Sequence, residues 1–450
     1  MSTTEAENPQ SILSYGVAPA RTLIGRSRVF ITLFDQALVS VASFFTNFLL
    51  LRHFAHDSEH YAYYTLAFNL MIWAAEFQAM LVLTPHTMRT PRLGGQALRR
   101  FHGSTLLQST GVSLLTGAGM LIAAMMASGR DVQMSYVLLA LAAGALVIGL
   151  RNYVRPYLFA AKSPMTAVAV DLTAAVLQIG GLLVLQKMGY LSAWSAILIM
   201  AIAAAVPSLI WLIWARRLFS PSVSVSITDF KQDWSITRWV FLSGMTWNIG
   251  MQLYPWLIVW TRGKEDVAIW GACFQLACVA NPLLMGLQNF IGPRIAEAHV
   301  ELSSHDFARH VYKTCVKTSL LMTGPAIVLS VFADDALRWI THGQFTGHAT
   351  TITLLCAAIV VQAGTFTLSR GLFAMQRADI DMYCNLLPMG VLFTIGFWAT
   401  SHYGVSGAAA SMVFAQLLAV SSRAIWFGFA ARTDAHVPAS RTDAHAGVNN

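Results

Sequence analysis

The sequence predicts an all-α, polytopic membrane protein, with about twelve transmembrane helices in two pseudo-symmetric six-helix bundles around a central cavity. Three observations predict this architecture. Hydrophobic residues make up 56% of the chain and charged residues only 11%, whereas roughly a quarter of the residues in a soluble domain are charged. Apolar runs of about 18 to 25 residues, each long enough to cross a bilayer as a helix, recur along the chain. The second half of the chain also repeats features of the first.

Twelve apolar runs bounded by polar, glycine or proline residues are the expected spans. They cover 29–51, 62–86, 104–128, 135–159, 165–187, 191–215, 238–261, 267–291, 314–333, 348–369, 379–400 and 404–430. The corresponding domains are a cytoplasmic N-terminal segment 1–28, a six-helix bundle 29–215, a cytoplasmic linker 216–237, a second six-helix bundle 238–430 and a tail 431–450. We expect the tail to be disordered, because its residues are small and polar.

The positive charges follow the alternation of the spans. When the connections are numbered from a cytoplasmic N-terminus, all but six of the 29 Lys and Arg residues fall on the inner side. The six exceptions are Arg52, Arg130, Lys187, Arg262, Lys264 and Arg338. This bias is the positive-inside rule, and it predicts a multi-pass protein of the bacterial inner membrane with both termini in the cytoplasm. It also accounts for the basic balance of the chain, so no nucleic-acid partner is expected.

The two halves of the chain match each other in order. YAYYTLAFNL (61–70) matches VAIWGACFQL (267–276), and RPYLFAAKSP (155–164) matches SRGLFAMQRA (369–378). The offsets are 206 and 214 residues, and the second register aligns Asp171 with Asn385. Six spans followed by six spans in the same orientation form a parallel duplication about an axis along the membrane normal. Alternating-access transporters are commonly built from two such bundles with a cavity between them.

Motifs of enzymes are absent from the sequence. It contains no GxxxxGK[ST], GxSxG or HExxH, so we expect a non-enzyme with no catalytic residue and no cofactor. The expected outer connections are short and leave no room for the large outer domain of saccharide polymerases and ligases. The loop LRHFAHDSEH carries His53, His56 and His60, which a solvated polar loop explains, and no metal is expected.

Three carboxylates inside the expected spans are candidates for ion or proton coupling: Asp35, Glu76 and Asp171. Ionisable residues within a membrane are functional suspects, because their burial is costly. Glu76 lies near the middle of its span. Asp35 and Asp171 lie closer to the ends of theirs, and an interfacial carboxylate paired with a nearby arginine is an equally good interpretation of each.

The first helix of the second half, SGMTWNIGMQLYPWLIVW, carries a polar stripe. Ser243, Asn248 and Gln252 recur at four or five residues, which places them roughly on one face of a helix. Asn248 and Gln252 are therefore candidates for binding substrate in a wet cavity. Hydrogen bonding between packed helices accounts for the same stripe equally well.

The stretch RNYVRPYLFAAKSP (151–164) places Arg151 and Arg155 one helical turn apart at the end of an apolar run. Arg155 falls near the cytoplasmic boundary, where an arginine can reach the interface and anchor the orientation of the helix. Arg151 lies one turn deeper, beside Asn152, and is a candidate for attracting an anionic group, for which a guanidinium is well suited. Arg370 is the matching candidate in the second half. We expect these four residues to contribute to a substrate site.

The beginning of the chain is similar to that of a known family. LFDQALVSVASFFTNFLLLRHF followed by YAYYTLAFNL resembles the opening of the polysaccharide-biosynthesis flippases of the multidrug/oligosaccharidyl-lipid/polysaccharide exporter (MOP) superfamily. Asp35, Gln36, Ser43 and Asn47 match the polar residues that punctuate the first helix of those proteins. RNYVRPYLFAAKSPMTAVAVDL resembles their fourth-to-fifth helix connection, and HYGVSGAAASMVFAQ (402–416) resembles the start of their last helix.

The resemblance implies two six-helix lobes in a V, and transport of a polyprenyl-pyrophosphate-linked oligosaccharide for surface polysaccharide such as O-antigen or exopolysaccharide. The expected partners are this lipid-linked substrate, membrane lipids, and polymerases or glycosyltransferases of the same pathway. The lipid II flippases carry arginines in their first helix, and this chain has none between Arg28 and Arg52. Two alternatives remain open: a cation-coupled multidrug or small-molecule exporter of the same fold, and a membrane glycosyltransferase or polymerase.

Overall fold

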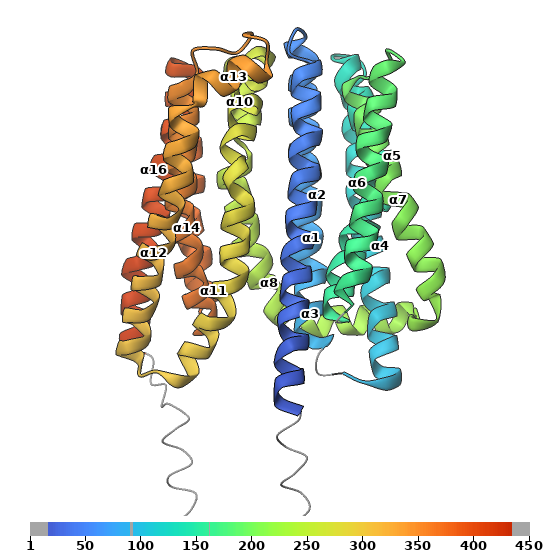
Figure 1. Cartoon of the computed structure of the whole chain (residues 1–450), viewed down its shortest axis with the longest axis vertical. Coiled ribbons are helices and arrows are strands. Elements are labelled where there is room, and N and C mark those ends of the chain that lie inside the picture. Colours follow the sequence, from blue (N-terminus) through green and yellow to red (C-terminus); the bar gives the residue numbers. More distant parts are fainter. Residues whose placement is uncertain (1–16, 91–92, 162, 434–450) are drawn as a thin grey trace, which may run out of the picture.

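The computed structural model describes residues 17–90, 93–161 and 163–433, and these residues form helices and short connections without a strand. Upright helices stand in two bundles (Figure 1). The N-terminal lobe contains α1 Val17–His53, α2 Ser58–Gln78, η1 Ala79–Leu83, α3 Thr84–Arg89, α4 Gly95–Ala127, α5 Val132–Ala160, α6 Pro164–Lys187 and α7 Ala193–Ala215. The C-terminal lobe contains α8 Val223–Gln252, α9 Tyr254–Thr261, α10 Lys264–Ala277, η4 Cys278–Ala280, α11 Asn281–Glu301, α12 Ser304–Val331, α13 Ala333–Ile340, α14 Ala349–Ala374, α15 Ala378–Val391, η5 Leu392–Gly396 and α16 Phe397–Thr433.

α1 begins and α16 ends at the same end of the molecule, at the bottom of Figure 1. We call this the terminal end and the opposite one the far end. The predicted N-terminal segment and tail lie largely outside the described residues, since α1 already begins at Val17 and α16 continues to Thr433.

Ten helical segments among the described residues are long and apolar enough to cross a membrane. The last, Ala378–Thr433, has 56 residues, which would extend over about 84 Å as one straight helix. Gly404 interrupts it with φ 59° and ψ −140°, a conformation that glycine adopts without strain. This segment therefore contains two crossings, and the end of α8 together with α9 forms the predicted span 238–261. The total agrees with the twelve spans predicted from the sequence.

Equivalent positions of the two repeats meet between the lobes. Thr65 on α2 and Gly271 on α10 are equivalent at the offset of 206 residues, and a Cβ added to Gly271 would lie 2.4 Å from the Thr65 hydroxyl oxygen. A side chain at position 271 would therefore force the Thr65 side chain to move. An equivalent pair in direct contact is the geometry expected at a two-fold axis, so the contact supports the parallel duplication seen in the sequence.

The predicted linker 216–237 is mostly helical. After the short η3 helix Arg216–Leu218, the first turns of α8 pack against the terminal end of the N-terminal lobe. Ser226 donates to the Ser104 carbonyl, and its own carbonyl accepts from Gln108. Arg89 forms ion pairs with Asp229 at 3.5 Å and Asp233 at 2.9 Å. The connection between the lobes is thus fixed to the first lobe by its polar residues.

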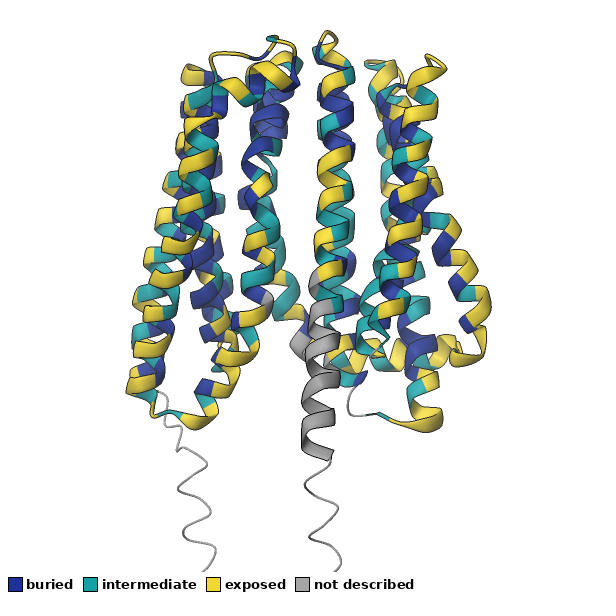
Figure 2. Cartoon of the chain, viewed as in Figure 1, coloured by how far each residue is buried: buried dark blue, intermediate teal, exposed yellow. Residues whose placement is uncertain are grey.

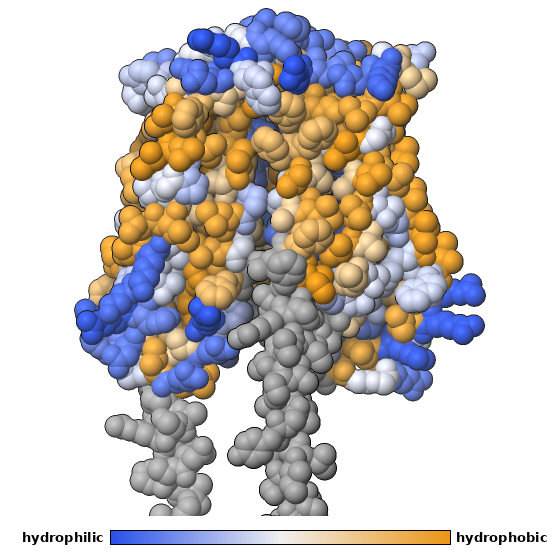
Figure 3. Space-filling model, viewed as in Figure 1, coloured by the Kyte–Doolittle hydropathy of each residue, from blue (hydrophilic) through white to orange (hydrophobic). Residues whose placement is uncertain are grey.

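The outer surface of the helices is apolar. Figure 3 shows a broad band of hydrophobic side chains between hydrophilic residues at the two ends, and Figure 2 shows that the buried residues lie where helices face one another. Only 11% of the most apolar stretch of α4 is buried within the protein. Its apolar side chains therefore contribute little to a protein core, and contact with lipid explains them.

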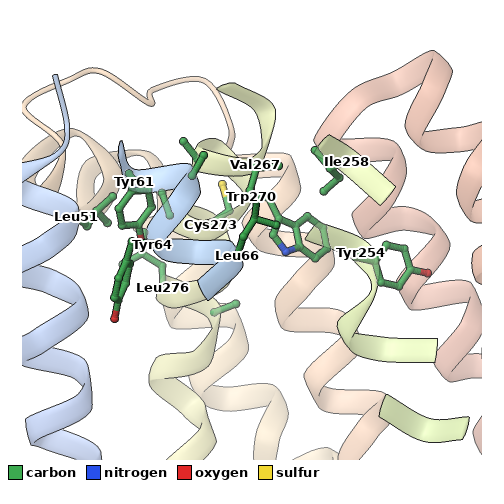
Figure 4. Packing of buried hydrophobic residues seen from close by; sticks show 14 of the residues in the cluster. Leu51, Tyr61, Tyr64, Leu66, Tyr254, Ile258, Val267, Trp270, Cys273 and Leu276 are labelled. Carbon is green, nitrogen blue, oxygen red and sulfur yellow. The ribbon is translucent and has the colours of Figure 1, made fainter. Parts of the chain in front are cut away.

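A large cluster of buried hydrophobic residues joins both lobes near the far end (Figure 4). Tyr254 and Trp270 stack with ring centroids 5.7 Å apart in the second lobe. Tyr61 and Tyr64 of α2 lie on the other side, with centroids 6.1 Å apart. Tyr61, Tyr64 and Trp270 also line the cavity described next, so this aromatic cluster forms part of its wall toward the far end.

Candidate functional site

A cavity of about 570 Å³ lies between the two lobes. α1 and α2 line it from the N-terminal lobe, and α8 to α11 line it from the C-terminal lobe. The polar residues of its lining are all amides or hydroxyl groups. They are Gln36, Ser40, Ser43, Asn47, Tyr61, Tyr64, Thr65, Asn69, Gln252, Gln275 and Asn281. None of the described residues that line the cavity carries a full charge.

Several of these polar groups are held in place by each other. Asn69 accepts from the Trp256 indole N–H at 3.0 Å and donates to the Gln252 side chain at 3.2 Å. Tyr64 donates to Asn47 at 2.9 Å. Gln252 was predicted as a substrate residue, and the structure places it in the cavity wall. Because packing and hydrogen bonds orient these amides, the cavity offers fixed donors and acceptors to a ligand.

Apolar side chains border the cavity between α1 and α11. Val41, Phe44, Val279 and Met285 belong to its lining and have exposed side chains. Figure 3 shows a narrow opening in the hydrophobic band, with hydrophilic side chains behind it. The cavity is therefore open sideways, toward the region that the hydrophobic band marks as lipid.

Two arginines and two aspartates form an ion network in the N-terminal lobe. Arg155 contacts Asp171 at 2.8 Å and Asp35 at 2.7 Å, and Arg151 contacts Asp171 at 3.1 Å. Arg155 also donates to the side-chain amide oxygen Oε1 of Gln36 at 3.2 Å. We call these five residues the Asp35 network. Gln36 lines the cavity, so the network lies directly beside it.

The Asp35 network is only partly sealed from solvent. Both carboxylates are buried, while the Arg151 and Arg155 side chains are 26% and 30% exposed. Asp35 Oδ1 is buried without a hydrogen-bond partner among the described residues. An unsatisfied carboxylate oxygen in a buried position is costly, and no hydrogen bond from the described residues offsets the burial of this oxygen.

A second network occupies the equivalent place in the C-terminal lobe. Arg423 of α16 contacts Asp381 at 2.8 Å. Ser243 and Ser369 each donate to Asp381 at 2.6 Å, and Asn385 accepts from Arg423. We call these five residues the Arg423 network.

The repeat register relates the two networks position by position. Offsets of 208, 214 and 214 residues relate Asp35 to Ser243, Arg155 to Ser369 and Asp171 to Asn385. The second network thus has hydroxyl and amide groups where the first has charges, and it receives its arginine from a different helix.

Sequence reasoning missed Asp381 and Arg423. Arg423 was counted among the basic residues that set the orientation, and Asp381 follows Asp379 closely at the start of a span. One signal was available: Arg423 lies more than one turn inside the predicted span 404–430, where an unpaired charge is expensive.

The other predicted residues lie outside the central cavity. Asn152 lines a crevice of about 20 Å³ within the N-terminal lobe, and Asn248 lines a separate apolar crevice between α2, α4, α5 and α8. Glu76 is exposed on α2, one turn beyond the cavity residue Ile72. Arg370 is exposed beside Gly292 of α11 and forms no ion pair with a described residue.

No family model and no curated protein matches the chain. Solved structures match it over nearly its whole length. A multidrug resistance MATE family transporter of the MOP superfamily in an inward-facing conformation is 14% identical, with 90% of this chain and all of that chain covered and a TM-score of 0.71. An outward-facing structure of a MATE transporter is 14% identical, with coverage of 89% and 98% and a TM-score of 0.61.

A MOP superfamily transporter from Pyrococcus furiosus is 12% identical, with coverage of 90% and 95% and a TM-score of 0.67. The reversed polarity of its binding pocket suggests a different function for that protein. At these identities the likeness concerns the fold. The chain therefore has the fold of the MATE transporters of the MOP superfamily, with two helical lobes around a central cavity.

Proposed function

We propose that this protein is a flippase that moves a polyprenyl-pyrophosphate-linked oligosaccharide across the membrane by alternating access. One observation carries the proposal: the central cavity has an uncharged lining of amides, hydroxyl groups and aromatic rings, and it opens sideways through apolar residues. A lipid-linked glycan needs a polar chamber for its sugars and an apolar exit for its tail. The cavity combines the two.

The chemistry of the lining suits sugars. Glycan hydroxyl groups both donate and accept hydrogen bonds, as do the side chains of Gln275 and Ser40, which have no partner among the described residues. The rings of Phe68, Trp270 and Phe274 offer flat apolar surfaces for the faces of sugar rings. A volume of about 570 Å³ lies in the range of small-molecule sites, roughly 300 to 1,000 Å³.

The pyrophosphate requires positive charge, and arginine is well suited to bind it. Arg370 is exposed without an ion-pair partner among the described residues. Arg151 and Arg155 are neutralised by Asp35 and Asp171. Protonation of Asp35 would leave the Asp35 network with a net charge of +1, so we propose that proton binding makes Arg155 available to the anionic substrate.

Orientation follows from the Lys and Arg distribution. We propose that the terminal end faces the cytoplasm of a bacterial inner membrane, because the basic residues of the sequence gather on the connections at that end. The greater similarity to the inward-facing transporter, with a TM-score of 0.71 against 0.61, then supports a cavity that faces the cytoplasm. Polymerases or glycosyltransferases of the same pathway would supply and consume the substrate.

The test is a chromosomal deletion in the source organism, complemented with the wild-type gene or with a cavity variant, Gln275→Trp. We expect the deletion to abolish the surface polysaccharide and to leave lipid-linked oligosaccharide on the cytoplasmic face. Gln275→Trp should fail to restore the polysaccharide, because the indole fills the cavity. Normal surface polysaccharide in the deletion strain would contradict the proposal.

A multidrug exporter is the second candidate, and Glu76 favours it. This carboxylate is exposed on the face of α2 that continues the cavity wall, where it could attract a cationic drug. Susceptibility of the deletion strain to amphiphilic cations separates the two functions. Increased susceptibility with unchanged polysaccharide, reversed by wild type and not by Glu76→Gln, would establish the exporter.

A further inference from the structure

The far end of the molecule contains an ion cluster that joins the two lobes. Lys264, the first residue of α10, belongs to the C-terminal lobe. Its ammonium lies 2.8 Å from Glu59 of α2 and 2.8 Å from Asp131, which precedes α5. It also donates to the Tyr63 hydroxyl and lies 4.5 Å from the centre of the Tyr63 ring. One cation from the second lobe thus contacts three residues of the first.

The N-terminal half of the cluster is preorganised. The Tyr63 hydroxyl lies 3.0 Å from Glu59 and 2.6 Å from Asp131, so it bridges the two carboxylates. Asp131 accepts from the backbone N–H of Met134 at 3.0 Å and caps α5. Burial raises the pKa of Asp131, but the hydrogen bonds from Lys264, Tyr63 and Met134 outweigh it and hold the pKa below its ordinary value. With Lys264 in contact, the Asp131 carboxylate is therefore charged, and Tyr63 and Met134 hold it in place.

The cluster lies at the far-end limit of a seam between α2 and α10. From the cluster toward the terminal end, the next contact of the seam is that between Thr65 and Gly271. After it, Asn69 of α2 donates a hydrogen bond to Gln252, the last residue of α8. Thr65, Gly271 and Asn69 all belong to the cavity lining. The seam is therefore the wall that separates the cavity from the far side, and the ion cluster lies on its outer edge.

We propose that Lys264 is a positioning residue that latches the α2–α10 seam, and that its contacts with Glu59 and Asp131 must break before the cavity opens to the far side. The contacts lie entirely between the lobes, so a movement that separates α2 from α10 breaks all of them together. The inference rests on the alternating access of the proposed function, but not on the identity of the substrate.

Cys278 provides a native reporter, because its side chain lines the cavity. The experiment measures its alkylation by a membrane-impermeant sulfonated maleimide, mapped by peptide mass spectrometry. It is carried out in right-side-out and inside-out vesicles, so that each face is tested. We expect Lys264→Met to accelerate labelling from the far side about fivefold, as loss of an ion pair worth about 1 kcal/mol would. Labelling from the terminal side should change little, because the state that is open to the far side remains the minor one.

Arg262 supplies a matched control. It lies two residues away and pairs with Asp266 of its own lobe at 3.1 Å, so Arg262→Met removes a neighbouring cation without touching the seam. This variant should label like the wild type. The charge exchange Lys264→Glu with Glu59→Lys should restore slow far-side labelling, which loss of structure alone would not do.

The outcomes are separable from those of the flippase test. Unchanged labelling in Lys264→Met and in Asp131→Asn would overturn the latch, whatever the substrate is. Equal acceleration in Arg262→Met would also overturn it, because the effect would then follow the charge of the far end and not the seam. Faster far-side labelling together with normal surface polysaccharide in a deletion strain would uphold the latch and contradict the proposed substrate.

Discussion

The Asp35 network and the Arg423 network occupy equivalent places in the two lobes, yet they differ in how they are satisfied. Arg423 is 1% exposed, and both carboxylate oxygens of Asp381 accept hydrogen bonds. In the first lobe the arginines are 26% and 30% exposed, and one oxygen of Asp35 has no partner among the described residues. The duplicated fold thus holds one closed network and one that is accessible.

The difference assigns different tasks to the two lobes. A buried ion pair with every partner in place resists any change of charge, because an unpaired charge in its position is very costly. A network beside the cavity with a partly exposed arginine can gain a proton or an anion at a lower cost. We therefore expect substitutions in the Arg423 network to act on folding, and substitutions in the Asp35 network to act on transport.

The largest expected effect is that of Arg423→Met. It leaves Asp381 buried without its cation, and breaking a buried pair costs about 3 to 5 kcal/mol. Thermal unfolding of the purified protein in detergent should shift down strongly, with less folded protein in the membrane. The double variant Arg423→Met with Asp381→Leu should recover most of the stability, since it removes the unpaired charge as well. If Arg423→Met were as stable as the wild type, the Arg423 network would not act on folding, and the two networks would not differ in this respect.

The second largest loss of stability is expected from Arg155→Ala, and Arg151→Ala is its matched control. Arg155 is the only described cation that contacts Asp35, whereas Asp171 keeps Arg155 when Arg151 is removed. Arg155→Ala should destabilise the protein by about 1 to 3 kcal/mol, less than a fully buried pair because Arg155 is partly exposed. Arg151→Ala should cost under about 1 kcal/mol. Thermal unfolding of both variants measures the order, and the reverse order would show that the ion contacts do not set the stability.

Asp35→Asn should separate transport from folding. The amide keeps the shape of the side chain and leaves Arg155 paired with Asp171, so stability should change by less than about 1 kcal/mol. Proton-driven transport in proteoliposomes should be lost, because the carboxylate that we propose to exchange the proton is gone. Asp379→Asn is the control, since Asp379 is exposed and pairs with Arg377 two residues away. Full activity of Asp35→Asn under a proton gradient would exclude Asp35 from coupling.

The sequence predicted the fold well for a physical reason. The length of apolar runs and the alternation of basic residues are properties of the chain that the bilayer itself imposes, and the repeat is visible directly in the sequence. Asp35, Arg151, Arg155 and Asp171 were each singled out as charges in apolar surroundings. These residues form one network because α1, α5 and α6 pack together, and this packing cannot be predicted from the spacing of residues along the chain.

Other features depend on tertiary contacts in the same way. Asn152 and Asn248 have amide side chains like those that line the cavity, but their positions on their helices place them in other crevices. The sequence of the linker predicted a polar, serine-rich connection. In the structure the linker is mostly helical, and Ser226, Asp229 and Asp233 bond to residues of the first lobe. Lys264, the proposed latch residue, is one of the six basic residues that do not follow the positive-inside rule. Its contacts with Glu59 and Asp131 explain why a lysine lies at the far end.

The smallest effect is expected from Gln36→Ala, where the Asp35 network meets the cavity. Gln36 accepts one hydrogen bond from Arg155 and lines the cavity. Its loss costs about 0.5 to 1.5 kcal/mol of binding, so the KM for the proposed lipid-linked substrate should rise a few-fold in proteoliposomes while thermal stability stays unchanged. Gln275→Ala, which removes a cavity amide that has no partner among the described residues, should raise KM without altering the pH dependence of transport. If Gln36→Ala shifts the pH dependence of transport and Gln275→Ala does not, Gln36 couples the Asp35 network to the cavity. If the pH dependence of both variants equals that of the wild type, the Asp35 network and the cavity are independent.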